Sequence, residues 1–172
     1  LPTGARGYID SFPIVLYYND EYMGCYTLNL PQDGKTYNFS DSAETAGTNL
    51  AYRTTDVGHW KDSSYWEYRG DEDETASMRA VFDNSVIPLL NDASLTKAKV
   101  EAVFDVDTLV AYLAFAQISC AVDSLINNWT LVTWDGIKWY HTWISTFALG
   151  SVVGRTVNQS AQQKMCLRRH RG

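Results

Sequence analysis

The chain has 172 residues, of which 45% are hydrophobic and 20% are charged, so its composition predicts a folded globular domain and excludes a disordered chain. A formal net charge of −6 argues against a protein that binds nucleic acid through its phosphate backbone. No apolar run reaches the roughly 18 residues that a membrane span requires, so we expect neither a nucleic acid nor a membrane as a partner.

The cysteines and histidines are few and scattered. They are Cys25, Cys120, Cys166, His59, His141 and His170. No group among them has the short spacing of a zinc site, and no nucleophile–histidine pair can be built from the sequence. We therefore expect no metal site and no structural disulfide from these residues.

The first predicted element is a β-hairpin over residues 8–30. Two β-rich runs flank Asn19-Asp20, and both of these residues tolerate the positive φ of a two-residue hairpin turn. Gly24 in the second run indicates a bulge or a close approach of another backbone. We expect one face of the hairpin to be lined by four apolar side chains, Val15, Tyr17, Tyr26 and Leu28.

Residues 31–60 are polar, with Gly, Ser, Asn and Asp throughout, and are predicted to form a long irregular segment. A loop of this length is unusual inside a domain and indicates an interaction surface or incomplete order. Lys35 and Lys61 lie in or beside it, where solvated side chains are expected. Residues 63–70 then alternate enough to form a short strand.

Three helices are predicted next. The acidic residues 71–74 would open the first, because carboxylates in a first turn complement the helix dipole. A calcium site is the alternative, but the run lacks the Gly and distal Glu of a calcium loop. The apolar positions of this helix keep helical spacing, and Pro88 should end or kink it. These positions are Met78, Val81, Phe82, Ser85 and Leu89.

After a short helix over residues 94–104, Asp105 or Asp107 is predicted to cap a longer helix that extends to Cys120. It is apolar nearly all round, which predicts burial on most sides, beneath the sheet. Residues 129–143 form the clearest hairpin in the chain, turning at Asp135-Gly136. We expect Trp134 and Trp139 of this hairpin to face a common layer.

Three stretches in this order resemble the spore-coat-H (CotH) family of kinase-like proteins, including the modules found in bacteriophage structural proteins. They are FPIVLYYNDEYMGCYTLNLP, YWEYRGDEDET and AVDSLINNWTLVTWDGIKWY. The resemblance implies an α+β fold with antiparallel hairpins packed on a buried helix, a degenerate form of the protein-kinase fold. It covers residues 1–150 as one module with an incomplete N-terminal lobe, and leaves residues 151–172 as a polar, basic tail.

The resemblance also assigns residues. Asp123 matches the catalytic-loop Asp of the family, and Asn128 matches the Asn that helps to hold a metal ion beside the nucleotide phosphates. The family then continues after its second hairpin into a stretch with a metal-binding Asp. Here residues 141–150, HTWISTFALG, contain no carboxylate. Because hard metal ions need anionic oxygen ligands, we expect Asp123 and Asn128 to be vestigial, with no metal and no cofactor bound.

The sequence leaves two main functions open. The first is a structural or binding module of a phage particle, in its tail or a fibre, that contacts other structural proteins and can form a homo-oligomer in the virion. The second is an active atypical kinase of the CotH type, represented by a fragment, which would use ATP and Mg²⁺ at a spore or cell surface. A third reading is an unrelated α+β domain, in which Asp123 is only a helix-end residue.

Overall fold

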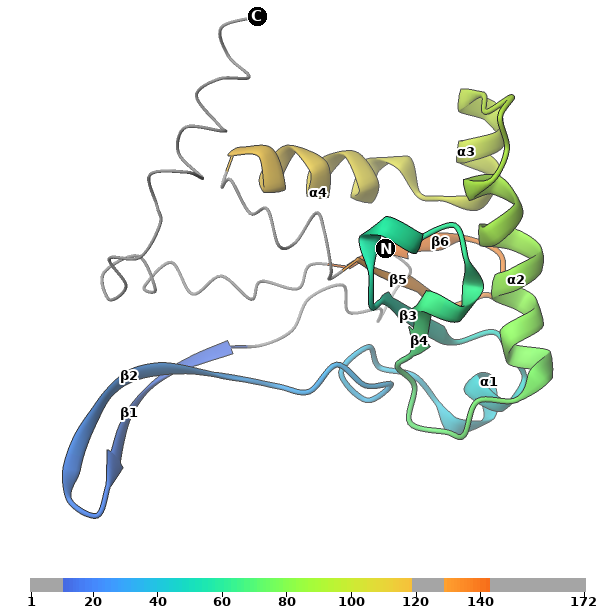
Figure 1. Ribbon diagram of the computed structural model, residues 1–172. Helices are drawn as coiled ribbons and strands as arrows, with labels where there is room; N and C mark the ends of the chain where they lie inside the picture. The colour runs from blue at the N-terminus through green and yellow to red at the C-terminus, as the bar shows by residue number, and fades with distance from the viewer. Residues whose placement is uncertain (1–10, 119–128, 143–172) are drawn as a thin grey trace, which may run out of the picture.

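The computed structural model describes residues 11–118 and 129–142, and this part of the chain contains two antiparallel sheets and four α-helices (Figure 1). The predicted α+β class is confirmed. The smaller sheet is a two-stranded hairpin that extends away from the rest, and the larger sheet has four strands with helices packed around it.

The hairpin joins β1 (Ser11–Tyr18) to β2 (Glu21–Asn29). Its turn residues Asn19 and Asp20 have φ angles of 48° and 64°, the left-handed values that a two-residue turn of type I′ requires. The hairpin and its turn are therefore confirmed.

A bulge in β2 changes which side chains share a face. Leu16 lies opposite Gly24 whereas Tyr17 lies opposite Tyr22, so Met23 is an extra residue and the register shifts by one. Gly24 has a φ of 121°, which confirms the special backbone expected there. A shift of one residue moves side chains to the opposite face. The expected apolar face was therefore wrong, because Tyr26 lies opposite Ile14 and not on the side of Val15 and Tyr17.

The four-stranded sheet has the order β4-β3-β5-β6, and all neighbouring strands are antiparallel. Its strands are β3 (Leu50–Thr54), β4 (Trp66–Tyr68), β5 (Thr130–Thr133) and β6 (Trp139–His141). The predicted strand over residues 63–70 begins with a 3-10 turn, Ser63–Tyr65, so only its middle is extended. A second 3-10 turn covers Val57–His59.

The prediction that residues 31–60 are irregular was wrong. They include α1 (Asp41–Thr45) and β3, which is an inner strand of the sheet. Leu50, Ala51 and Tyr52 are fully buried. A strand that is covered on both faces shows no alternation of apolar and polar residues, so its sequence does not stand out from a loop.

Helix α2 (Ala76–Leu90) covers one face of the sheet and forms the centre of the larger core. Its side chains Met78, Phe82 and Val86 are fully buried, and the Phe82 ring lies 4.4 Å from the ring of Tyr52 in β3. The helix begins later than predicted, because Thr75 accepts a hydrogen bond from the Met78 N–H and residues 71–74 precede this cap.

Pro88 was expected to end or kink α2. It lies inside the helix, which ends at Leu90, and the kink stays a prediction. One detail of the second hairpin differs from the prediction. Trp139 packs in the α2 core, whereas Trp134 packs on the opposite face of the sheet beside Phe39. The two tryptophans do not share a layer, because Trp139 lies opposite Thr133 and the next residue, Trp134, points to the other side.

Helices α3 (Lys97–Val103) and α4 (Val106–Ile118) follow. Asp105 caps α4 by accepting a hydrogen bond from the Thr108 N–H at 2.9 Å, as predicted. The expectation that α4 is buried beneath the sheet was wrong. Tyr112 is buried, but Val110 and Ile118 are 55% and 85% exposed. The helix covering the core is α2, and α4 lies over the edge strand β6 (Figure 1). No helix in the described ranges is long and apolar enough to cross a membrane.

Candidate functional site

The candidate site lies at the end of the sheet where β5 begins and β6 ends. Asp123 and Asn128, the two predicted site residues, lie outside the described residues. The residues on either side of them are described. Helix α4 ends at Ile118, and the chain is described again from Trp129, directly before β5.

Three strands meet at this end of the sheet. The Thr54 N–H at the end of β3 donates to the Trp129 carbonyl at 2.9 Å, and the Thr142 N–H just after β6 donates to the Thr130 carbonyl at 3.1 Å. The chain after Asn128 and the chain after His141 are therefore joined by backbone hydrogen bonds.

His141 is the only titratable side chain of β5 and β6 that points toward the larger core. Its neighbours there are aromatic. Its ring stacks on Tyr112 of α4 with a centroid distance of 3.5 Å, and Trp129 contacts it edge-on at 5.9 Å. Burial lowers the pKa of His141 to about 3. The imidazole is therefore neutral at physiological pH, and neither ring nitrogen has a hydrogen-bond partner among the described residues.

Three threonines surround the same end of the sheet. Thr54, Thr130 and Thr142 are at most 1% exposed, and their hydroxyl groups lack hydrogen-bond partners in the described part of the chain. Unpaired buried hydroxyls are uncommon, and water or a ligand often satisfies them. Hydroxyls and a neutral imidazole carry no negative charge, so these side chains cannot supply the anionic oxygen that a magnesium ion needs.

Asp135 lies at the opposite end of the β5–β6 hairpin and has a structural role. Its carboxylate accepts hydrogen bonds from the N–H groups of Ile137 and Lys138, both at 2.8 Å. Partial burial would raise the pKa of Asp135, but these backbone hydrogen bonds outweigh it and lower the pKa. The turn-forming role predicted for this residue is confirmed, and it removes Asp135 as a replacement for the missing metal ligand.

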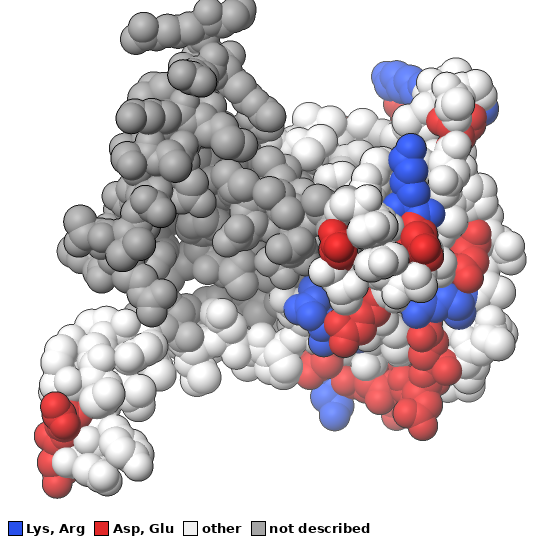
Figure 2. Space-filling view, viewed as in Figure 1, with Lys and Arg blue, Asp and Glu red and all other residues white. Residues whose placement is uncertain are grey.

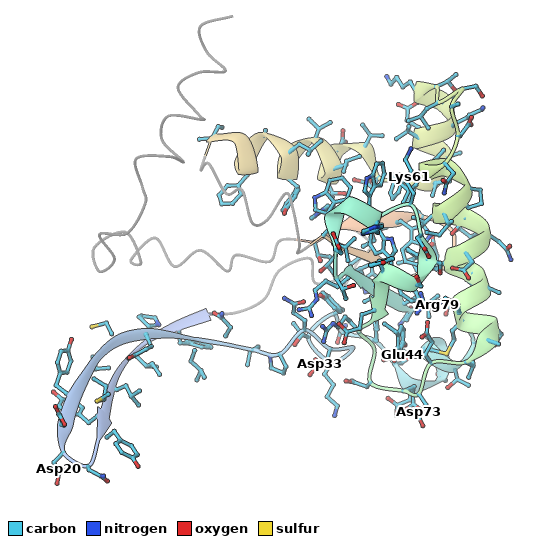
Figure 3. All side chains as sticks on the ribbon, in the orientation of Figure 1. Asp20, Asp33, Glu44, Lys61, Asp73 and Arg79 are labelled. Carbon is cyan, nitrogen blue, oxygen red and sulfur yellow. The ribbon has the colours of Figure 1, made fainter. Side chains whose placement is uncertain are left out.

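The acidic residues 71–74 are also held by structural interactions, and one of their partners was missed by the sequence reasoning. Glu44 of α1 is 1% exposed, and its Oε2 atom accepts hydrogen bonds from the Tyr68 hydroxyl and the Asp71 N–H, both at 2.8 Å (Figure 3). No signal in the sequence marks Glu44, because it lies in a polar segment where an exposed carboxylate is the ordinary expectation.

Glu74 completes this structural network. Its carboxylate pairs with Arg79 at 2.7 Å and accepts a hydrogen bond from the Tyr52 hydroxyl at 2.7 Å. Arg79, which is labelled in Figure 3, also donates to the Trp66 carbonyl and lies over the Tyr52 ring. Within residues 11–118 and 129–142, no group of three or more His, Cys, Asp or Glu residues could hold a metal ion. Lys35 and Lys61 are exposed, as expected.

The comparison with known protein families gives a match. A family model described as CotH kinase protein matches residues 10–153, which is most of the chain. The chain belongs to the CotH kinase protein family. No curated protein and no solved structure matches it. The matched residues of this CotH protein include Asp123, Asn128 and both hairpins. The roles of Asp123 and Asn128, and the division between residues 1–150 and 151–172, stay predictions.

Proposed function

We propose that this CotH-family chain is a catalytically degraded binding module that packs against other structural proteins of an assembly. A phage particle, through its tail or a fibre, is the assembly that the sequence resemblance favours. The observation that carries the proposal is the β1–β2 hairpin, which projects from the body of the protein (Figure 1) and exposes apolar side chains on both faces.

The hairpin exposes an unusual amount of apolar surface. Tyr18, Tyr22 and Leu28 are 67%, 57% and 55% exposed, and the hairpin is white in Figure 2 except for the acidic residues at its tip. Figure 3 labels one of these, Asp20. Isolated two-stranded hairpins are at best marginally stable in water, and large exposed apolar patches mark interaction sites. A partner that covers the hairpin would both stabilise it and bury its apolar surface.

The proposed loss of catalysis rests on the chemistry at the sheet end. Phosphoryl transfer depends on positioning and on neutralising the charge of the phosphates with metal ions. Residues 141–150 offer no carboxylate, and the side chains of Thr130 and Thr142 are neutral hydroxyls, with the cation Arg53 opposite Thr130. Asn128 is then the only metal ligand that the resemblance provides, with Asp123 as a vestigial neighbour.

An active kinase is the second candidate, and the pair Asp123 and Asn128 favours it. The test is to add millimolar Mg²⁺ and ATP and to measure thermal unfolding, since a ligand stabilises the folded state in proportion to its occupancy. The binding module should show no shift. A shift of several degrees that disappears in Asn128→Ala, or autophosphorylation that disappears in Asp123→Asn, would establish the kinase instead.

Binding is tested separately, with the structural proteins encoded beside this gene. Tyr18→Ser combined with Leu28→Ser should weaken co-purification with them and leave the melting temperature unchanged. The matched control replaces exposed apolar residues away from the hairpin, Leu95→Ser with Ile137→Ser, which are 53% and 70% exposed. Equal losses of binding in both double variants would contradict a role for the hairpin.

A further inference from the structure

One face of the four-stranded sheet carries hydrogen-bond donors that are buried and have no acceptor. We name this group the donor cluster; it consists of Tyr37, Arg53, Arg69, Thr130 and Thr142. One side-chain N or O atom of each residue is buried without a hydrogen-bond partner in the described part of the chain. Buried donors without acceptors are rare in proteins, and a missing water, ion or ligand is a common explanation.

The register of the strands places Arg53, Thr130 and Thr142 on a single face, and Tyr37 packs on that face against Ala51 and Val132. Arg53 in β3 lies opposite Glu67 in β4 on one side and opposite Thr130 in β5 on the other. Residues directly opposite each other in an antiparallel sheet share a face. Thr142 continues the pairing of β6 with β5 beyond His141, and its N–H donates to the Thr130 carbonyl.

Arg53 and Arg69 share one carboxylate. The Nη2 atoms of Arg53 and Arg69 lie 3.3 Å and 2.5 Å from the same oxygen, Oε2 of Glu67. Two guanidinium groups and one carboxylate leave one positive charge at this point of the sheet. The exposed fractions of the Arg53 and Arg69 side chains are 27% and 23%, so solvent reaches one edge of each.

Each guanidinium uses only half of its binding edge. The Nε–H and one Nη–H of an arginine form a fork that fits two oxygens of a carboxylate or phosphate group. In Arg53 and Arg69 the Nη2 atom is bonded to Glu67, whereas the Nε atom is buried without an acceptor. The single Glu67 oxygen therefore pairs with one N–H of each fork and leaves the Nε–H of both arginines without an acceptor.

The three hydroxyl groups of the cluster extend the set of donors. Tyr37 and Thr130 are 0% exposed and Thr142 is 1% exposed. Burial raises the pKa of Tyr37 to about 12, opposed by the Thr142 hydroxyl and the positive charge of Arg53. The phenol is thus a protonated donor at neutral pH, and it lies near both residues, although no contact on its oxygen meets hydrogen-bond geometry.

We propose that the donor cluster binds a phosphate group. A carboxylate has two oxygens, and Glu67 shows that one carboxylate leaves both Nε atoms unmet. A phosphate offers three or four acceptor oxygens on one centre and a charge of up to −2, which suits two guanidinium forks and the neighbouring Thr130 hydroxyl. The Glu67 side chain is 49% exposed and can turn into solvent when the phosphate enters.

The test is isothermal titration calorimetry at low ionic strength with inorganic phosphate, with O-phosphoserine, and with acetate. Phosphate should bind more tightly than acetate. Arg69→Met should weaken phosphate binding at least about tenfold, since hydrogen bonds to charged groups are among the strongest in proteins. The tighter of inorganic phosphate and O-phosphoserine then identifies the source as a free ion or an ester.

The sharpest variant is Glu67→Gln, because it should act in the opposite direction. Gln has nearly the same size as Glu but no charge, so the substitution removes the carboxylate that competes with phosphate for the two arginines and creates no cavity. Phosphate affinity should therefore rise severalfold. Lys61→Met is the control, since it removes one positive charge from an exposed position outside the cluster and should leave binding unchanged. Arg69→Lys keeps the charge but loses the fork and should bind weakly, which covers the case in which Arg69→Met fails to fold.

Several results would overturn the assignment. These are no detectable phosphate binding, equal binding of acetate, an equal loss in Lys61→Met, or no gain in Glu67→Gln. If structural water satisfies the donor cluster in place of a ligand, no phosphate binding will be detected. The proposal does not depend on the proposed function, because inorganic phosphate and O-phosphoserine carry no nucleotide and the experiment contains no Mg²⁺.

Discussion

At the scale of single residues, His141 couples the candidate site to pH. Its folded-state pKa of about 3 lies below the ordinary value of 6.5, because burial against Tyr112 and Trp129 disfavours the charged ring. Between these two values the unfolded chain binds a proton that the folded chain does not. Stability therefore rises with pH across this window and falls as the pH drops below about 6.5.

We predict that the free energy of unfolding decreases by about 1 kcal/mol between pH 7 and pH 5.5, measured by urea denaturation. This interval lies above the range in which the carboxylates titrate, so it isolates histidine. His141→Phe should remove the slope, whereas His59→Asn, at an exposed position, should keep it. An unchanged slope in His141→Phe would show that another group is responsible.

Glu44 is a second residue whose chemistry can be tested. Its Oε2 atom accepts from the Tyr68 hydroxyl and two backbone N–H groups, those of Asp71 and Glu72. Glu44→Ala would leave buried donors unpaired and should lower the free energy of unfolding by about 1–3 kcal/mol. The control Asp41→Ala, at an exposed position of the same helix, should change it by less than about 0.5 kcal/mol.

At the scale of elements, the core depends on α2 and much less on α4. Phe82 is 0% exposed and contacts the rings of Tyr52 and Trp139, whereas Leu113 is only partly buried. Phe82→Ala should therefore cost about 3–5 kcal/mol in unfolding free energy. Leu113→Ala should cost less than about 2 kcal/mol, because part of its surface is already in contact with water. Similar losses of unfolding free energy in Phe82→Ala and Leu113→Ala would show that α4 contributes as much to the core as its apolar composition indicates.

The elements also show which parts of the fold were predictable. Both hairpins have local turn residues, Asn19-Asp20 and Asp135-Gly136, that restrict the backbone by themselves, and both were predicted correctly. Strand β3 has no such signal, because tertiary contacts on both faces decide its conformation. The burial of α4 was overestimated because composition alone does not show which apolar helix faces the core.

The same distinction applies to the candidate site. Asp123 and Asn128 can be singled out from the sequence, since their spacing and the neighbouring hairpin form a motif. The buried hydroxyls of Thr54, Thr130 and Thr142 could not be singled out, because threonine in a strand is ordinary. Their lack of partners arises only when three strands that are distant in sequence end side by side.

At the scale of the whole molecule, the two sheets differ in how they are stabilised. The four-stranded sheet is covered by α2 on one face and by residues around Tyr37 on the other. The β1–β2 hairpin extends away from it, and most of its large side chains are exposed (Figure 1). Local opening is easiest where few apolar groups are buried, so the two sheets should open with very different free energies.

Hydrogen exchange followed by mass spectrometry measures this difference directly. Amides in β3 and β5 should be the most protected, because these inner strands have neighbours on both sides and buried residues on both faces. Amides in β1 and β2 of the isolated protein should exchange orders of magnitude faster, since a two-stranded hairpin alone is marginal in water. Addition of a partner that covers the hairpin should slow exchange there and leave β3 unchanged. Equal protection of both sheets in the isolated protein would mean that the hairpin is already covered, and would remove the main support for an exposed binding surface.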